Sequence, residues 1–269
     1  MDRTIKFKSF DGSDLVGTLA GEEHDDHGVL LVHGLPSDKD EWGFYSDFAR
    51  FLENGSITSL RFDFRHCGES EAGSLQDVSM SEFVNDIDAA YWELKSKLRD
   101  SANVYLVATS AGGGLSLKWL TTCRRKVHKV FLMAPVLDYV FEVTGRKSEE
   151  LSGTPRTLDD LSLQTLKRSG RLNDDAGYGR QMVNDAINFD AVDEILASRS
   201  DFTIFHGDAD TVVPIDFSRE VSRRCPNVKL VELPSCDHGF SAPGDEDLTD
   251  PRTKANHERV YHEVLGAIR

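Results

Sequence analysis

The chain has 269 residues, 39% hydrophobic and 29% charged, which is typical of a folded globular protein and not of a disordered segment. Its formal net charge of −15 argues against nucleic acid and against an anionic membrane surface as partners, because both attract basic faces. No run approaches the ~20 apolar residues of a membrane span. The N-terminus lacks the apolar core of a signal peptide, and the four cysteines show no CxxC spacing. We therefore expect a cytoplasmic protein with reduced thiols.

Short apolar runs alternate with helical patterns over most of the chain. Residues 4–10 and 14–20 flank an Asp-Gly-Ser turn and predict an antiparallel hairpin. Runs rich in Val, Leu, Ile and Phe predict strands buried on both faces at 28–33, 57–64, 103–109, 128–134, 202–207 and 227–233. Helical patterns lie near 41–54, 81–99, 112–123, 214–224 and 253–268. The alternation predicts an α/β fold with a mostly parallel eight-stranded sheet and helices on both faces.

The alternation is interrupted between residues 137 and 195. This segment carries several glycines, many charges and scattered aromatic residues. It is too long for one ordinary loop of a compact domain, so it should have structure of its own. We expect a short helical lid inserted after the sixth strand. Residues 1–136 and 196–269 would then form the core domain.

The most informative stretch runs from residue 103 to 114, where an apolar run ends at Ser110 among small residues and a helical pattern follows at once. A sharp turn from strand to helix holds the intervening side chain in a strained conformation, with its hydroxyl pointing out of the sheet. The usual pattern, Gly-x-Ser-x-Gly, has glycine where this chain has Ala108. Taken alone, the stretch also fits a plain connection between a strand and a helix.

Acid and base candidates lie at the ends of two later strands. Asp208 and Asp210 follow the run 202–207, and His238 lies just beyond the last strand. A serine hydroxyl is a poor nucleophile until an imidazole takes its proton. The imidazole in turn needs a carboxylate that fixes its tautomer and stabilises the imidazolium. Together with Ser110, these residues predict nucleophilic catalysis of acyl transfer.

The loop after the third strand supplies the remaining part of such a site. His33 ends the run 28–33, and Gly34, which follows it, permits a tight turn. The Leu35 N–H could then point at a developing oxyanion, with the Ala111 N–H as the second donor at a helix N-terminus. We expect His33 and Gly34 to line the substrate site, with His33 shaping the loop through hydrogen bonds rather than transferring protons.

These segments, with Asp-Phe-Arg-His-Cys-Gly-Glu-Ser at 63–70, resemble the α/β-hydrolase-fold serine hydrolases over almost the full length of the chain. The chain is most similar to compact lidded esterases such as the feruloyl and cinnamoyl esterases, and to monoacylglycerol-lipase-like and serine-aminopeptidase-like hydrolases. The order serine, acid, histidine is the order of that fold. The family pattern Gly-x-x-Asp-x-x-Val-Pro falls on Asp210 and so favours it over Asp208. In the segment 63–70, His66 replaces a glycine of the family pattern.

The resemblance implies a carboxylic-ester hydrolase that acts through a covalent acyl-enzyme. Ser110 would attack the carbonyl, His238 would shuttle the proton, and Asp210 would hold His238. The backbone amides of Leu35 and Ala111 would stabilise the oxyanion. We expect a small-molecule ester as substrate, no metal and no cofactor, and leave open whether the protein forms a homodimer.

Two alternatives remain. The same machinery serves aminopeptidases, thioesterases and carbon–carbon bond hydrolases. An aminopeptidase would need carboxylates in the lid to hold a substrate ammonium, and the candidates there are Glu142, Glu149, Glu150, Asp159 and Asp160. A protein from a different class, a catalytically silent ligand receptor on the same fold, is the second alternative.

Overall fold

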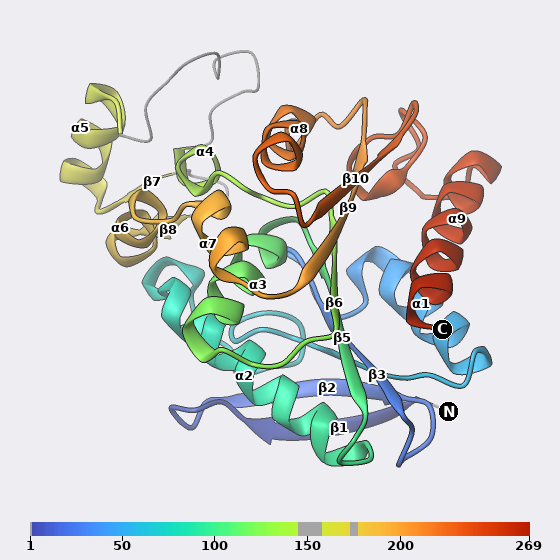
Figure 1. Cartoon of the computed structure of the whole chain (residues 1–269). Helices are drawn as coiled ribbons and strands as arrows, with labels where there is room; N and C mark the ends of the chain where they lie inside the picture. Colours follow the sequence, from blue (N-terminus) through green and yellow to red (C-terminus); the bar gives the residue numbers. More distant parts are fainter. Residues whose placement is uncertain (1, 145–157, 173–176) are drawn as a thin grey trace.

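The computed structural model describes residues 2–144, 158–172 and 177–269. Its centre is an eight-stranded sheet in the order β1-β2-β4-β3-β5-β6-β9-β10 (Figure 1). The strands are β1 (Arg3–Lys8), β2 (Asp14–Ala20), β3 (His27–Val32), β4 (Thr58–Phe62), β5 (Asn103–Thr109), β6 (Lys129–Met133), β9 (Asp201–Gly207) and β10 (Val228–Leu233). Strand β2 pairs antiparallel with β1 and β4, and the other neighbours are parallel. The predicted mostly parallel sheet of eight strands is confirmed.

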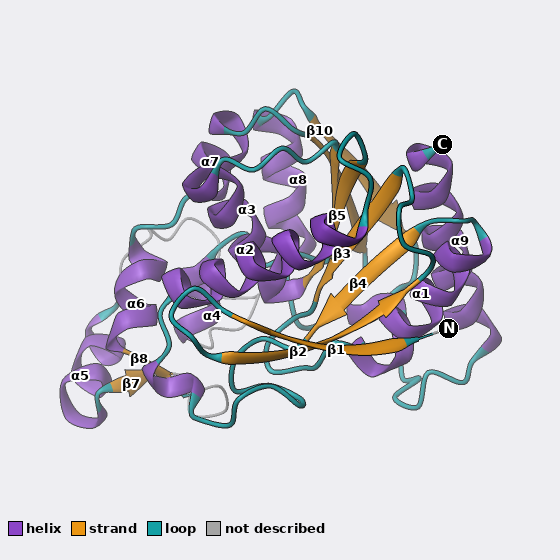
Figure 2. Ribbon diagram, turned by 90° about the horizontal axis from the view of Figure 1, so that it is seen from below, coloured by secondary structure: helices purple, strands orange, loops and turns teal. Residues whose placement is uncertain are grey.

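Helices cover both faces of the sheet, as Figures 1 and 2 show. Helices α1 (Phe44–Asn54) and α9 (Pro251–Ile268) lie on one face, where the rings of Phe48 and Tyr261 stack with centroids 4.6 Å apart. The opposite face carries α2 (Met80–Lys97), α3 (Ser110–Cys123), α7 (Ala191–Ala197) and α8 (Ile215–Arg224). Both faces of the central strands are therefore buried, which explains their nearly continuous apolar sequences.

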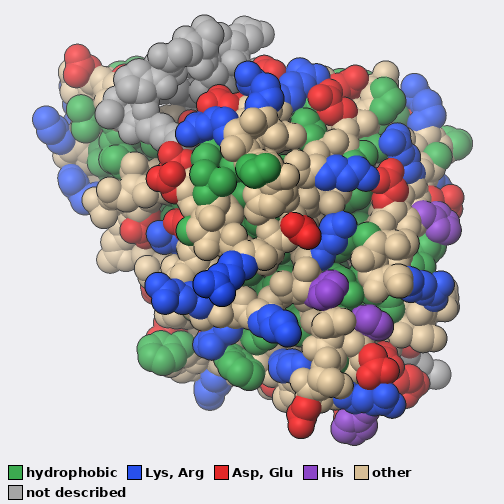
Figure 3. Space-filling model, viewed as in Figure 1, with side chains coloured by type: hydrophobic (Ala, Val, Ile, Leu, Met, Phe, Trp, Pro, Cys, Tyr) green, Lys and Arg blue, Asp and Glu red, His purple; other side chains and the backbone are tan. Residues whose placement is uncertain are grey.

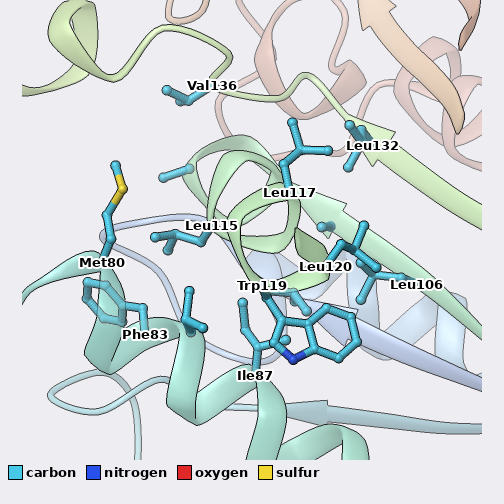
Figure 4. Packing of buried hydrophobic residues seen from close by; sticks show 14 of the residues in the cluster. Met80, Phe83, Ile87, Leu106, Leu115, Leu117, Trp119, Leu120, Leu132 and Val136 are labelled. Carbon is cyan, nitrogen blue, oxygen red and sulfur yellow. The ribbon is translucent and has the colours of Figure 1, made fainter. Parts of the chain in front are cut away.

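Helix α2 shows how the sequence specifies its own packing. Ser79 and Glu82 form a capping box at its N-terminus, which satisfies backbone donors there. Its buried stripe includes Phe83 and Ile87, and Figure 4 shows Ile87 beside the ring of Trp119 of α3. The Trp119 indole N–H donates to Asp88 at 3.0 Å, so this large ring is buried without losing its hydrogen bond.

The predicted helix over 41–54 divides into two parts. A 3-10 turn, η1 (Glu41–Gly43), precedes α1, which begins only at Phe44. Glu41 and Trp42 have φ of 46° and 56°. Positive φ values interrupt a right-handed helix, and nothing in the residue pattern indicates them because neither residue is glycine.

The segment between β6 and β9 contains α4 (Tyr139–Thr144), α5 (Asp160–Ser169), α6 (Arg180–Ile187) and α7, joined by a small antiparallel ladder. The ladder pairs β7 (Arg171–Leu172) with β8 (Tyr178–Gly179), strands too short to leave a periodic signal in the sequence. Parts of the expected lid at 137–195, including Glu149 and Glu150, lie outside the described residues. Its division from the core stays a prediction.

The remaining short elements are η2 (Leu75–Asp77) and η4 (His238–Phe240). No helix in the described ranges is long and apolar enough to cross a membrane. Acidic and basic side chains are intermixed on the face shown in Figure 3.

Candidate active site

Ser110 stands at the turn between β5 and α3 with a φ of 50°, a left-handed conformation that is strained for a residue with a side chain. Ala108 lies inside β5 in regular pairing, so the alanine that replaces the usual glycine needs no positive φ. Gly112 lies close to the backbone at the end of β3, since a Cβ there would lie 2.2 Å from the carbonyl oxygen of His33. The small residues around Ser110 thus allow α3 to pack against the loop after β3.

The structure brings Asp210 to the imidazole of His238. The Nδ1 atom of His238 lies 2.8 Å from Oδ2 of Asp210, whose side chain is fully buried. The other carboxylate oxygen accepts the N–H groups of Val212 and Val213 at 2.9 and 2.8 Å. Burial alone would raise the pKa of Asp210, but hydrogen bonds from His206 and His238 outweigh it and lower that pKa.

The two neighbouring carboxylates are used elsewhere. Asp208 accepts the N–H of Ser235 at 2.6 Å and shapes the turn. Asp237 accepts the N–H groups of Thr211 and His238, so it holds the loop that carries the imidazole. Asp210 is therefore the carboxylate that orients His238.

The His238 side chain is 22% exposed. Burial lowers the pKa of His238, but its carboxylate partner Asp210 more than compensates, so the pKa is raised. Because Nδ1–H donates to Asp210, Nε2 is left free to accept a proton. His238 and Thr109, the residue before Ser110, line one cavity of about 330 Å³. Within the described residues, no hydrogen bond joins the Ser110 hydroxyl to the His238 ring.

The loop after β3 is held by a fully buried histidine. The N–H of Phe64 donates to Nε2 of His33 at 3.0 Å, so Nδ1 carries the proton and donates to the Gly34 carbonyl at 2.6 Å. The C=O and N–H of a trans peptide point in opposite directions. Fixing the Gly34 carbonyl therefore turns the Leu35 N–H away from His33. The His33 ring acts on the loop and is not itself exposed.

Both expected oxyanion donors are available. The hydrogen bonds of the described residues give the Leu35 N–H no acceptor. Ala111 lies in the first turn of α3, where N–H groups have no partner inside the helix. A Cβ on Gly34 would lie 2.9 Å from Cβ of Ser110, so the loop and the serine are in direct contact. The Leu35 and Ala111 N–H groups thus belong to the two segments that meet at this contact.

Two residues of the site escaped the sequence analysis. His206, at the end of β9, donates from Nε2 to the Val213 carbonyl at 2.9 Å and lies 3.3 Å from Asp210. Its Nδ1 accepts the Ser218 hydroxyl at 2.8 Å. The other is Glu41, whose carboxylate accepts the Gly34 N–H at 2.8 Å. The only sequence signal for His206 is a histidine at the end of a predicted strand, which is weak. Glu41 gives no signal, because the sequence predicts that it lies inside a helix over 41–54.

The segment between β6 and β9 adds a further carboxyl. Glu142 of α4 is half-buried and accepts the Tyr178 hydroxyl at 2.7 Å. Burial raises the pKa of Glu142, while the Tyr178 hydroxyl and the charge of His238 oppose the rise. Asp159 and Asp160 stand at the exposed start of α5. Among the described residues, no group of three or more His, Cys, Asp or Glu side chains could hold a metal ion.

A mostly parallel eight-stranded sheet with a strained serine between β5 and α3 defines the α/β-hydrolase fold. The family model described as serine aminopeptidase, S33, matches residues 23–242, and the chain belongs to this family of hydrolases. No curated protein matches the chain.

Solved structures of similar fold include esterases. The esterase Est1E from Butyrivibrio proteoclasticus is 20% identical with a TM-score of 0.71, and 98% of each chain is covered. An esterase from Pyrococcus furiosus is 16% identical with a TM-score of 0.68, covering all of this chain and 91% of that one. Mouse alpha/beta hydrolase domain-containing protein 10 is 16% identical with a TM-score of 0.74, covering 99% and 98%. At these sequence identities the structural similarity shows a shared fold only.

Proposed function

We propose that the protein is a serine esterase that cleaves small carboxylic esters through a covalent acyl-enzyme. The observation that carries the proposal is the buried Asp210 bonded to His238 at 2.8 Å, in a chain whose His238 shares a cavity with Thr109, the residue before the strained serine of the β5–α3 turn. Aspartate, histidine and serine in these roles form the triad of acyl transfer. One mechanism therefore assigns a role to Ser110, Asp210 and His238, which are remote from one another in the chain.

In the first step the Ser110 oxygen attacks the ester carbonyl while its proton passes to Nε2 of His238. Asp210 keeps the other ring proton on Nδ1 and stabilises the imidazolium that forms. The Leu35 and Ala111 N–H groups receive the negative charge on the carbonyl oxygen. The imidazolium then protonates the departing alcohol. In the second step His238 takes a proton from water, which attacks the acyl-enzyme, and the proton returns to Ser110 as the acid leaves. Catalytic hydrogen bonds are often long in a free enzyme and tighten only with substrate, which is consistent with the lack of a Ser110–His238 hydrogen bond among the described residues.

We expect the cavity that His238 lines to hold the acyl or alcohol group of the substrate. Its walls are largely apolar and include Phe44, Met133, Phe240 and Leu248. Apolar walls with few polar groups are typical of small-molecule sites. A volume of about 330 Å³ suits an aliphatic or single-ring group. Est1E, an esterase of similar fold, has been solved with ferulic acid bound, and we extend to this chain an acyl group of that kind, a small carboxylic acid released from its ester. We also propose that the segment 137–195 acts as a lid over the site.

A second candidate, cleavage of an aminoacyl amide, is favoured by one observation. Glu142 places a half-buried carboxyl in the segment between β6 and β9, where the charge of His238 opposes the rise of its pKa. A carboxylate in this segment could hold a substrate ammonium. The description of the family as serine aminopeptidases accords with it.

Hydrolysis assays separate the candidates. The purified protein is tested against p-nitrophenyl esters of increasing acyl length and against aminoacyl p-nitroanilides, with Ser110→Ala as the control. We expect the esters to be the better substrates and Ser110→Ala to lose activity and labelling by a fluorophosphonate. Turnover of anilides alone would favour the aminopeptidase. A folded protein that neither turns over any substrate nor reacts with the fluorophosphonate would be a ligand receptor.

A further inference from the structure

A carboxyl outside the expected triad lies against the oxyanion loop. Glu41 begins η1, where Glu41 and Trp42 both adopt the left-handed φ that residues other than glycine rarely take. Both residues line the cavity that His238 also lines, and Trp42 is 79% exposed at its edge. Such strain persists only where the surrounding structure enforces it, and it is concentrated at functional sites.

The Glu41 carboxyl contacts the peptide that precedes the oxyanion donor. Its Oε2 atom accepts the Gly34 N–H at 2.8 Å, while the Gly34 carbonyl accepts Nδ1–H of His33 at 2.6 Å. Both polar groups of Gly34 are therefore held, and with them the direction of the Leu35 N–H. A Cβ on Gly34 would lie 3.4 Å from Oε1 of Glu41 and 3.5 Å from Oγ of Ser110. The carboxyl and the nucleophile thus flank the same glycine.

The electrostatic surroundings of Glu41 contain one group that can become a cation. Among the described residues Glu41 makes no ion pair with Lys or Arg, and His238 is the titratable base of the cavity lining. Burial raises the pKa of Glu41 to about 7, and the Gly34 N–H and the charge of His238 oppose the rise. The other groups that face it are acidic or phenolic, namely Asp38 in its own loop, Tyr45 of α1, and Asp245 and Glu246 across the cavity.

We propose that Glu41 is a second positioning carboxylate of the active site. It holds the oxyanion loop through Gly34, and its charge stabilises the imidazolium of His238 when that ring takes the serine proton. The proposal rests on the proposed function, because both effects act on the acyl-transfer step. It differs from the role of Asp210, which orients the ring by direct contact.

Two substitutions separate the two effects. Glu41→Gln keeps an oxygen that accepts the Gly34 N–H but removes the charge, so the acid limb of kcat/KM for a p-nitrophenyl ester should move to lower pH. Glu41→Ala also frees the loop, and kcat/KM at high pH should fall up to about 100-fold, as when an oxyanion donor is lost. Glu220→Gln, which removes an exposed carboxylate of α8 that is paired with Arg224, is the matched control and should change neither quantity.

A second measurement does not depend on turnover. The imidazole of His238 is titrated by NMR in protein labelled with ¹⁵N-histidine, and its signal is identified by its absence in His238→Gln. We expect His238 to titrate at lower pH in Glu41→Gln than in the wild type and Glu220→Gln. An unchanged titration, or a folded Glu41→Ala with wild-type kcat/KM, would overturn the proposal. If the wild type hydrolyses nothing, the proposed function fails, and the NMR titration alone decides whether Glu41 acts on His238.

Discussion

Replacing Asp210 by asparagine should move the proton of the His238 imidazole, the proposed catalytic base, from Nδ1 to Nε2. The Val212 and Val213 N–H groups both donate to Oδ1, so the amide oxygen of asparagine will take that side. The amide nitrogen then faces His238, where Oδ2 accepted the Nδ1 proton at 2.8 Å. An N–H donor at that place forces the proton onto Nε2, which can no longer accept one from serine. His206, 3.3 Å from Oδ2, also loses an acceptor.

The magnitude follows from the tautomer. In serine proteases the equivalent change lowers kcat about 10⁴-fold without disturbing the fold. A factor of 10⁴ corresponds to about 5 kcal/mol of activation free energy. The structure predicts a similar loss for Asp210→Asn because the same ring nitrogen is affected.

The assay is the steady-state hydrolysis of a p-nitrophenyl ester, with circular dichroism to establish that each variant is folded. Asp208→Asn is the matched control two residues away. Its amide oxygen can still accept the Ser235 N–H, so this variant should keep most of its activity. Equal losses in Asp208→Asn and Asp210→Asn would refute the assignment of Asp210 as the acid.

Three further predictions concern pH and stability. Because the pKa of His238 is raised and the ring must be neutral to act as a base, kcat/KM should rise with pH through a midpoint above the ordinary value of about 6.5, and a lower midpoint would contradict this. Gly112→Ala should lower both Tm and activity, because its Cβ would lie 2.2 Å from a backbone oxygen. As a control, the exposed helical Gly266 has nothing within 4 Å, so Gly266→Ala should raise the free energy of unfolding in urea by about 1 kcal/mol. Asp86→Ala should lose about 3–5 kcal/mol of unfolding free energy, since it removes the buried partner of Arg65 at 2.6 Å. A loss below 1 kcal/mol would show that Asp11 and Glu82, which also pair with Arg65, compensate for Asp86.

Much of the fold could be predicted from local patterns in the sequence. The buried strands are short, apolar and separated by amphipathic helices, so their order and spacing indicate a parallel sheet before any contact is known. The turn at Ser110 is predictable because close packing at Gly112 tolerates only a small residue, and the sequence shows that directly. The ends of strands can also be located in the sequence, and Asp210 and His238 lie just beyond two of them.

The rest depends on contacts between remote segments. The choice between Asp208 and Asp210 rested on a family pattern, because two carboxylates so close in the chain look alike until their hydrogen bonds are seen. Glu41 lies inside the site only because two non-glycine residues adopt positive φ, which no residue preference indicates. The support that His206 gives to the acid requires strand β9 and the following loop to fold back on each other.

The most direct test of the account is a crystal structure of the protein after reaction with a phosphonate ester that mimics the tetrahedral intermediate. We predict a bond from Oγ of Ser110 to phosphorus, a phosphonyl oxygen within hydrogen-bond distance of the Leu35 and Ala111 N–H groups, and Nε2 of His238 beside the serine oxygen. An adduct on another residue would contradict the account, as would an imidazole that stays out of reach of the bound group.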